Sequence, residues 1–355
     1  MKVVDFIVTG SGLAGSSMAY ELVKRGFKVL RVTSMRRPAS MAAYGMLNPI
    51  HIRNARLSWK ARELYPIAVS FYRELQMALQ QEFFRETEIF HILGSLEEAI
   101  YWRQQAETGM LGEFCSGEVE FLTDPQWNVP FGSIKITGAL YVDVPLLLHE
   151  LHKWLNTNQS PLMVCETDAQ VWKYERSSVQ MNEYRARYVI HCEGVAATSH
   201  ALWKNIPFRP CKGEVLTLQF DDSLPPQIVH KKIFIIPQPD GTCKAGATYE
   251  WDDLSDEPTL EGTREILQKV ASITTSSFTL KEQVAGVRPA VADRRPVVGV
   301  HPLYPSVAIL NGYGSRGLIF NPYCCKILAD YLLHQKPIPT ELNVQRFNKR
   351  ILATD

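Results

Sequence analysis

The chain opens on a strand, a glycine-rich turn and a helix, and this order constrains its fold more than any other feature. Residues 3–8 are apolar and mostly β-branched except for Asp5, as in a strand that is buried on both faces of a parallel sheet. The turn Gly10-Ser11-Gly12-Leu13-Ala14-Gly15 follows at once. Residues 16–25 then have one apolar and one polar helical face, and residues 28–32 form a second strand. The pattern predicts a βαβ unit.

The spacing G-x-G-x-x-G inside such a unit is typical of a dinucleotide-binding turn. Gly10 permits the tight turn, Gly12 lets the backbone approach a pyrophosphate, and Gly15 lets the helix pack closely on the strand. The helix N-terminus offers free N–H groups and the positive end of its dipole. The alternative is a glycine-rich turn that binds no ligand.

The end of the second strand lacks the acidic residue that usually accepts hydrogen bonds from a ribose. Thr33 and Ser34 stand there, and Arg36 and Arg37 follow. A basic pair at this place fits the 2′-phosphate of NADP, or it belongs to a solvated loop. The turn alone therefore does not choose between FAD and NADP.

Composition predicts a soluble protein of two domains. The chain has 355 residues, 46% hydrophobic and 21% charged, and single cores stop growing at about 250 to 300 residues. Lys and Arg total 38 against 37 Asp and Glu, so no overall charge directs the protein to nucleic acid or to an anionic membrane. No apolar stretch reaches the roughly 18 residues of a membrane span, and we expect a cytoplasmic protein.

Cysteine and histidine spacing gives no sign of a metal centre. The seven cysteines include no C-x-x-C pair, which argues against structural zinc and against a disulfide framework. His149 and His152, three residues apart on a predicted helix, have no third ligand nearby in the sequence. We therefore expect no metal.

The rest of the chain combines helices with groups of strands. Helices are predicted at residues 58–79, 145–155, 259–271 and 323–333, and strands at 90–93, 119–122, 138–143, 164–165, 169–174, 178–181, 187–190, 214–220, 229–236, 242–247, 284–289 and 307–310. Residues 311–317 form a second glycine-rich turn before the last helix. Such a helix start suits a ligand atom that gains negative charge, and a flexible connection is the alternative.

Five stretches, in this order, resemble the D-amino-acid oxidase (DAO) family of FAD-dependent amine and amino-acid oxidases, which includes glycine oxidase and sarcosine oxidase. They are residues 10–15, 39–49, 141–145, 286–299 and 312–317. Ser315-Arg316-Gly317 and Gly246-Ala247-Thr248-Tyr249 are also similar to the FAD domain of the bifunctional enzyme that matures wobble uridines in tRNA.

The resemblance implies a mixed fold, α/β plus α+β, in which a Rossmann-like FAD/NAD(P)-binding domain carries a discontinuous antiparallel-sheet substrate domain. The FAD domain would comprise residues 1–80, 136–205 and 284–355, and the substrate domain residues 81–135 and 206–283. The resemblance favours FAD. Sarcosine oxidases link flavin to a cysteine near the position of Arg288, where this chain has none, so we expect non-covalent FAD.

The family's positions imply one set of residues for FAD. They are Gly10, Ser11, Gly12, Leu13, Ala14, Gly15, Thr33, Ser34, Ser40, Met41, Ala42, Gly45, Met46, Leu47, Val171, Gly194, Arg288, Gly312, Gly314, Ser315, Arg316, Gly317 and Leu318. Val171 would lie near the adenine, and residues 314–318 at the pyrimidine edge of the isoalloxazine. Along the isoalloxazine would lie Ser40, Ala42, Gly45 and Met46.

A second set is implied for the substrate and the reaction. Arg288 resembles the arginine that pairs with the substrate carboxylate in glycine oxidase, and Arg316 would assist it or hold its own loop. Lys244 resembles the lysine beside the flavin that promotes reaction with oxygen in sarcosine oxidase, or it simply points to solvent. His51 and Arg53 resemble basic residues near that flavin, or they are surface charges.

We therefore expect an oxidoreductase that oxidises a C–N bond of an amino acid or secondary amine by hydride transfer to flavin N5, followed by imine hydrolysis. Phe234 stands where glycine oxidase has a substrate-contacting Tyr, which leaves the substrate open. One alternative is FAD-dependent removal of a carboxymethyl group from a modified wobble uridine in tRNA. A second is FAD binding without catalysis. The expected partner is a small-molecule amine or amino acid, with tRNA as the alternative.

Overall fold

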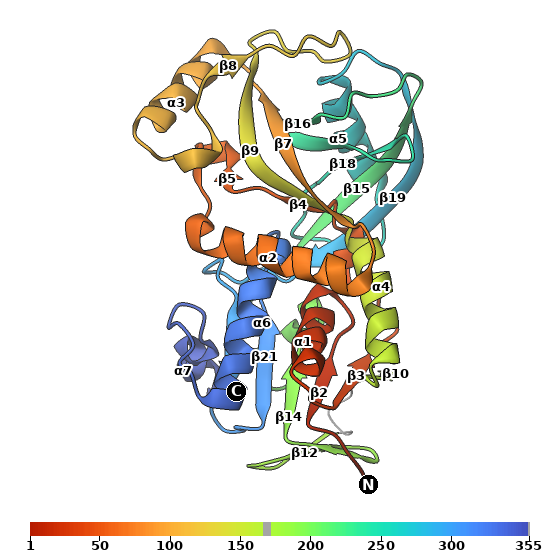
Figure 1. Ribbon diagram of the computed structural model, residues 1–355, viewed down its shortest axis with the longest axis vertical. Coiled ribbons are helices and arrows are strands. Elements are labelled where there is room, and N and C mark those ends of the chain that lie inside the picture. Colours follow the sequence, from red (N-terminus) through yellow and green to blue (C-terminus); the bar gives the residue numbers. More distant parts are fainter. Residues whose placement is uncertain (166–171, 354–355) are drawn as a thin grey trace.

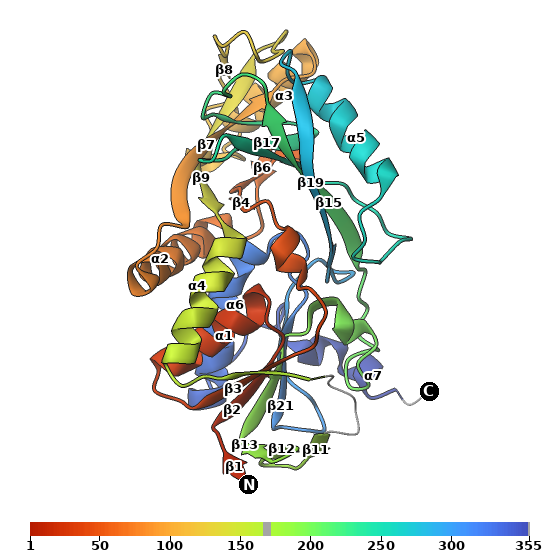
Figure 2. The same cartoon turned by 90° about the vertical axis from the view of Figure 1, so that its right-hand side faces the viewer.

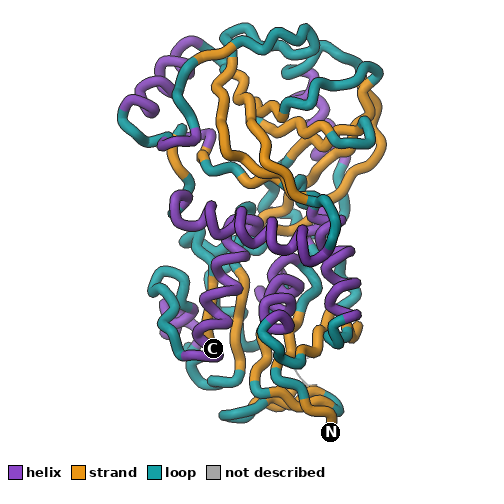
Figure 3. Tube along the Cα trace, viewed as in Figure 1, coloured by secondary structure: helices purple, strands orange, loops and turns teal. Residues whose placement is uncertain are grey.

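The computed structural model describes residues 1–165 and 172–353 and has two tiers (Figure 1). The lower tier combines a largely parallel sheet with three long helices, and the upper tier consists mostly of strands (Figure 3). Helix α2 (Ala61–Leu79) lies across the boundary between them. The predicted fold class, an α/β part joined to an antiparallel-sheet part, is confirmed.

The lower tier is built on a six-stranded sheet in the order β10-β3-β2-β14-β21-β20. These strands are β10 (Leu162–Val164), β3 (Val29–Thr33), β2 (Phe6–Thr9), β14 (Tyr188–His191), β21 (Val307–Asn311) and β20 (Val297–Val300). Neighbours are parallel except for β20 and β21. Helices α1 (Leu13–Lys24), α4 (Val144–Thr157) and α6 (Gly317–His334) cover one face (Figure 2).

A small four-stranded sheet packs against the opposite face of this sheet. Its strands, in spatial order, are β1 (Lys2–Val3), β13 (Tyr184–Ala186), β12 (Val179–Met181) and β11 (Trp172–Tyr174). Trp172, Val179 and Met181 share a buried apolar cluster with Ile7 and Leu30 of the central strands. The central strands are therefore buried on both faces, as their β-branched sequences predict.

The upper tier is a nine-stranded sheet in the order β19-β15-β18-β17-β16-β7-β9-β4, with β8 paired to β9. The strands are β19 (Phe278–Arg288), β15 (Cys211–Phe220), β18 (Thr242–Gly246), β17 (Ile233–Pro237), β16 (Ile228–Lys231), β7 (Phe84–Ile92), β9 (Ser133–Val142), β4 (Met46–Leu47) and β8 (Val119–Glu120). Helix α5 (Leu260–Ala271) buries Ile266 and Val270 against one face.

The remaining elements are short or peripheral. They are α3 (Leu96–Glu107), α7 (Asn348–Ile351), the hairpin of β5 (Ile50–His51) and β6 (Arg56–Leu57), and 3₁₀ turns that include η1 (Ala39–Ala42) and η5 (Gly194–Thr198). No helix in the described ranges combines the length and apolar character needed to cross a membrane.

The first predicted strand is in fact two strands in different sheets. Asp5 interrupts the run, and its carboxylate accepts a hydrogen bond from the Lys28 amide (2.8 Å). Val3, on the terminal side of this break, is exposed and pairs with Arg185 in the small sheet. Only residues 6–9 enter the centre of the large sheet. The prediction of one buried strand over residues 3–8 was therefore wrong at its start.

The last long helix begins directly at the second glycine turn, at Gly317 and not at Tyr323 as the sequence predicted. Pro322 lies inside this helix and has no N–H for the carbonyl of Leu318, four residues earlier. The hydroxyl of Tyr72 on α2 donates to that carbonyl instead (2.9 Å). A proline that normally breaks a helix is thus accommodated by a side chain from another helix. Residues 46–47 form the edge strand β4, which pairs with β9.

We predict that Tyr72→Phe lowers the free energy of unfolding by about 1–3 kcal/mol, because the buried Leu318 carbonyl loses this donor. Tyr65, seven residues earlier on the same helix, provides the matched control, since its buried hydroxyl has no hydrogen-bond partner. Tyr65→Phe should change the stability much less. Denaturant unfolding of the two variants checks the difference, and equal effects would contradict the role given to Tyr72.

Candidate cofactor and substrate site

A cavity lies where the two tiers meet, at the carboxyl ends of the parallel strands. Of the residues expected to hold FAD, those that line it are Gly10, Ser11, Gly12, Leu13, Ala14, Thr33, Ser34, Ser40, Ala42, Gly45, Met46, Gly194, Arg288, Gly314, Ser315, Gly317 and Leu318. Gly15, Met41, Leu47, Gly312 and Arg316 are outside this lining, and Val171 falls outside the described residues. Segments far apart in the sequence thus converge on one cavity.

The first glycine turn is packed so tightly that two of its positions admit no side chain. Gly10 has a φ of +93°, and a Cβ there would lie 2.3 Å from the Cys192 carbonyl oxygen. A Cβ at Gly15 would lie 1.9 Å from the carbonyl oxygen of Gly10. These contacts fix the start of α1 against the ends of β2 and β14. The first turn of α1 then faces the cavity with amide groups that suit an anion.

The strand β3 ends in hydroxyl groups where an acidic residue is usual. The Thr33 hydroxyl hydrogen-bonds to the Ser11 hydroxyl (2.8 Å), and Ser40 Oγ accepts from the Leu13 amide (3.2 Å). The hydroxyl groups of Thr33 and Ser11 therefore link β3 to the glycine turn at the wall of the cavity.

Arg36 forms an ion pair with Asp256, in the loop between β18 and α5. Its Nε and Nη2 atoms donate to the two carboxylate oxygens of Asp256 at 3.0 and 2.5 Å, and both residues line the cavity. This bidentate pair neutralises the guanidinium, so Arg36 is not a free cation for the 2′-phosphate of NADP. Arg37 beside it is exposed.

Arg288 places a guanidinium on the cavity wall without an acidic partner in the described residues. It donates to the carbonyl oxygens of Thr248 (3.2 Å) and Lys212 (3.3 Å) and lies 4.6 Å from the centroid of the Tyr249 ring. A Cβ on Gly213 would lie 1.8 Å from its Nη2 atom, so the absence of a side chain at Gly213 makes room for it. Backbone carbonyls and an aromatic ring leave its charge unneutralised.

A second arginine, Arg316, carries an unpaired charge close to Tyr249 and Tyr44. The Arg316 side chain has no hydrogen bond or ion pair with the described residues, and burial lowers its pKa. Burial raises the pKa of Tyr44 to about 12, and the charges of Arg288 and Arg316 oppose that shift. His51 has its pKa lowered by burial and by Arg316. Arg288, Arg316 and His51 thus share one electropositive region around Tyr44.

Arg53 and Lys244, proposed from the family resemblance, lie outside the cavity lining, as do Arg316 and His51. Arg53 is exposed in a 3₁₀ turn. Lys244 is half-buried in β18, on the face it shares with its cross-strand neighbour Ile236, which packs in the same apolar cluster as Ile50 and Tyr44. The neighbouring residues Cys243 and Ala245 pack with α5, so Lys244 lies on the opposite face of the sheet.

Sequence patterns did not reveal how the loop between β18 and α5 is held. Lys212 is completely buried, and its ammonium group donates to Asp253 Oδ2 (2.5 Å), Ser255 Oγ (3.2 Å) and the Glu257 carbonyl. The hydrogen bond from Lys212 is the main cause that lowers the pKa of Asp253 to about 2. This loop also carries Asp256, so a buried lysine positions part of the cavity wall.

Comparison with known proteins gives a consistent result. The sequence model of the family described as FAD dependent oxidoreductase (DAO) matches residues 5–331. Glycine oxidase of Bacillus licheniformis is 27% identical over 96% of this chain and 95% of its own length. The bifunctional tRNA 5-methylaminomethyl-2-thiouridine biosynthesis protein MnmC of Marinobacter nauticus is 24% identical over 93% of this chain and 55% of its own.

The fold has close counterparts among solved structures. The crystal structure of glycine oxidase from Geobacillus kaustophilus matches with a TM-score of 0.79 at 20% identity, over 95% of this chain and 96% of that one. This shared fold agrees with the two tiers described above, with the glycine turn and with the cavity between the tiers. Because the family model spans nearly all of the sequence, the chain belongs to the DAO family of FAD-dependent oxidoreductases.

Proposed function

We propose that this enzyme oxidises the C–N bond of a small amine that carries a carboxylate, such as an amino acid or an N-substituted amino acid. The observation that supports this most is Arg288, whose guanidinium lines the cavity with carbonyl and ring contacts but no acid. Its planar fork matches a carboxylate in two parallel hydrogen bonds. The similarity to glycine oxidase supports the same substrate class.

The residues of the cavity fit FAD. The first turn of α1 offers amides to a pyrophosphate, and the N-terminus of α6 at Gly317 offers a second positive dipole end. Among the described residues that line the cavity, the cysteine is Cys192. Burial raises the pKa of its thiol and so disfavours the reactive thiolate, and we therefore propose that FAD binds without a covalent link. We assign the cofactor to residues 1–80, 136–205 and 284–355, and the substrate sheet to residues 81–135 and 206–283.

The side chains around the substrate would act by position and charge. The chemistry that a bound FAD would supply is acceptance of a hydride from the α-carbon of the amine. Arg288 would fix the carboxylate, and with it the direction of the α-carbon. The positive charges of Arg288 and Arg316 would favour the neutral form of a bound amine, which is the form that can lose hydride.

Substitution of Arg288 tests its proposed contact with the substrate carboxylate. Arg288→Leu should weaken binding of a small carboxylate inhibitor by about 2–5 kcal/mol, the usual effect of truncating one partner of a buried charge pair. Titration of the inhibitor against flavin absorbance measures it. The exposed Arg53 serves as control, and Arg53→Leu should bind the inhibitor as the parent does. Unchanged affinity in Arg288→Leu would show that the carboxylate binds elsewhere.

Lys244 is proposed to assist oxidation of the reduced cofactor by oxygen, since a nearby cation stabilises the negative charge that forms on oxygen. Lys244→Met should slow reoxidation by about 100- to 1000-fold, equivalent to about 3–4 kcal/mol. Stopped-flow mixing of chemically reduced protein with oxygen measures this rate without any known substrate. Lys281→Met, at an exposed position of β19, should leave the rate unchanged. Equal rates in parent and Lys244→Met would remove Lys244 from the reaction.

The pair of Arg36 and Asp256 is proposed to hold the cavity closed over bound FAD. Both side chains are about one-third to two-fifths exposed, so we expect a modest coupling of about 0.5–1 kcal/mol. Arg36→Asp and Asp256→Arg should each speed FAD release about two- to fivefold, and the combined swap should restore slow release. Dilution experiments that follow flavin fluorescence measure these rates. A double variant no slower than the singles would rule out the contact.

A second function has one specific observation in its favour. Tyr249 and Trp251 are more than half exposed, and their rings stack at 6.2 Å and 24°. Exposed stacked rings beside an unpaired arginine suit a nucleobase and phosphate, so the alternative of carboxymethyl removal from tRNA stays open. Anaerobic mixing with amino acids and with modified tRNA, while flavin absorbance is followed, discriminates the two. Reduction by neither would indicate FAD binding without catalysis on these substrates.

A further inference from the structure

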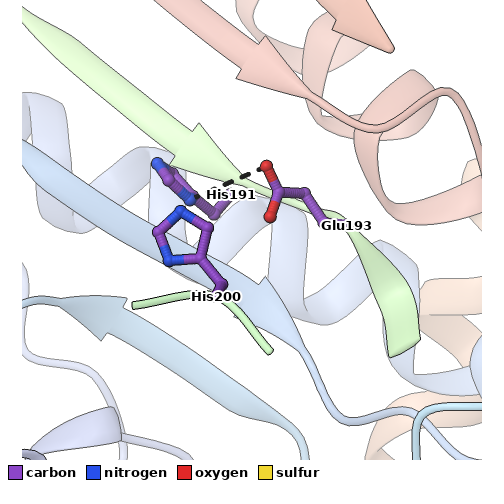
Figure 4. A group of neighbouring side chains, drawn as sticks. All are labelled: His191, Glu193 and His200. Carbon is purple, nitrogen blue, oxygen red and sulfur yellow. Dashed lines mark ion pairs between the residues drawn. The ribbon is translucent and has the colours of Figure 1, made fainter. Parts of the chain in front are cut away.

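Three side chains with metal-binding chemistry meet at the end of β14, outside the proposed reaction. His191 is the last residue of β14, Glu193 follows at the start of η5, and His200 comes from the turn after η5. Figure 4 shows both histidine rings and the carboxylate turned toward one another. One potential ligand atom from each residue lies within 4.8 Å of the others.

Three polar atoms of this cluster are buried without hydrogen-bond partners. His191 is 1% exposed, and neither of its ring nitrogens has a partner. Oε1 of Glu193 is also unpartnered, and its distance to His191 Nδ1 is 3.8 Å, which is too long for a hydrogen bond. Each such group costs about 1–3 kcal/mol when it is left unsatisfied. A cation bound between these side chains would satisfy the Glu193 oxygen and one of the two His191 nitrogens.

We propose that His191, Glu193 and His200 bind one Zn²⁺ ion. Two imidazole nitrogens and a carboxylate oxygen form a donor set typical of zinc, with a fourth position left for water. Tetrahedral zinc with bonds of about 2.0–2.2 Å separates its ligand atoms by about 3.4 Å, so small side-chain rotations from the present positions complete the site.

Burial disfavours the charged form of all three side chains. It lowers the pKa of His191 and of His200 and raises the pKa of Glu193, and a bound cation would offset the cost of keeping this carboxylate ionised. Nδ1 of His200 accepts a hydrogen bond from the Leu202 amide (3.2 Å). Binding through Nε2 would place the ring proton on Nδ1, opposite the Leu202 N–H, so zinc binding would cost this one long hydrogen bond.

The position of the site indicates a structural ion. Glu193 and Gly194 also line the cofactor cavity, and the Gly194 carbonyl accepts from Asn311 Nδ2 (2.8 Å) at the end of β21. An ion between residues 191, 193 and 200 would tie the turn that forms this wall to the central sheet. It would lie behind the wall and would not touch the substrate carboxylate at Arg288.

Metal content of the FAD-loaded, tag-free protein tests the proposal directly. After loading with Zn²⁺ and gel filtration, we expect about one equivalent of zinc by elemental analysis, and a higher melting temperature than in the chelator-treated protein. His200→Gln should weaken zinc binding at least tenfold in competition with a chromophoric chelator, since loss of even an outer-shell partner costs 10- to 100-fold. His200 is only partly buried, so this variant is not expected to prevent folding.

His149→Gln is the matched control. His149 is exposed on α4, and its neighbour His152 is hydrogen-bonded to Ser16 Oγ (2.8 Å), so the pair does not form a second site. This variant should bind zinc as the parent does. Less than about a tenth of an equivalent of zinc in the loaded parent, or equal affinity in parent and His200→Gln, would overturn the proposal.

Discussion

The close packing of the first glycine turn against the end of β14 is the constraint on which the cofactor site depends. The Cβ positions of Gly10 and Gly15 are filled by the backbone oxygens of Cys192 and Gly10. Any side chain there would push α1 away from β2 and β14, and the free amides of its first turn would no longer face the cavity. The same contact aligns the segment after β14, so one packing arrangement forms two walls of the site.

The upper tier depends on a different interaction, the buried ammonium of Lys212. Its three partners all lie in the acidic loop between β18 and α5. Glu214, two residues along the same strand, accepts from the amide and hydroxyl of Thr259 at the end of this loop (3.0 and 2.7 Å). An acidic loop that would otherwise be solvated is therefore fixed over the cavity. Removal of one partner would leave a buried charge uncompensated, which is costly.

Local sequence signals predicted the parts of the fold that are local. The glycine turn, the alternation of helices and strands, and the fold class follow from periodicity and from the order of the family stretches. The start of α6 was missed because Pro322 is compensated by Tyr72, a residue about 250 positions away in the sequence, as the Tyr72 and Leu318 contact shows. The partner of Arg36 was missed for the same reason, since Asp256 lies 220 residues further on.

The cluster at the end of β14 illustrates the same limit. The spacing of His191, Glu193 and His200 matches no linear metal motif, and the 3₁₀ turn between them brings the third residue back toward the first two. The sequence instead drew attention to His149 and His152, which point to different partners. A cluster of side chains that a turn brings together can be recognised only once the path of the backbone is known.

The measurement that tests the central claim most directly is a crystal structure of the FAD-loaded protein with a small carboxylate bound. The account predicts non-covalent FAD along the glycine turn and the N-terminus of α6, with the carboxylate paired to the guanidinium of Arg288 beside Tyr249. A carboxylate bound away from Arg288, with that guanidinium still engaged only by the Thr248 and Lys212 carbonyls, would contradict it.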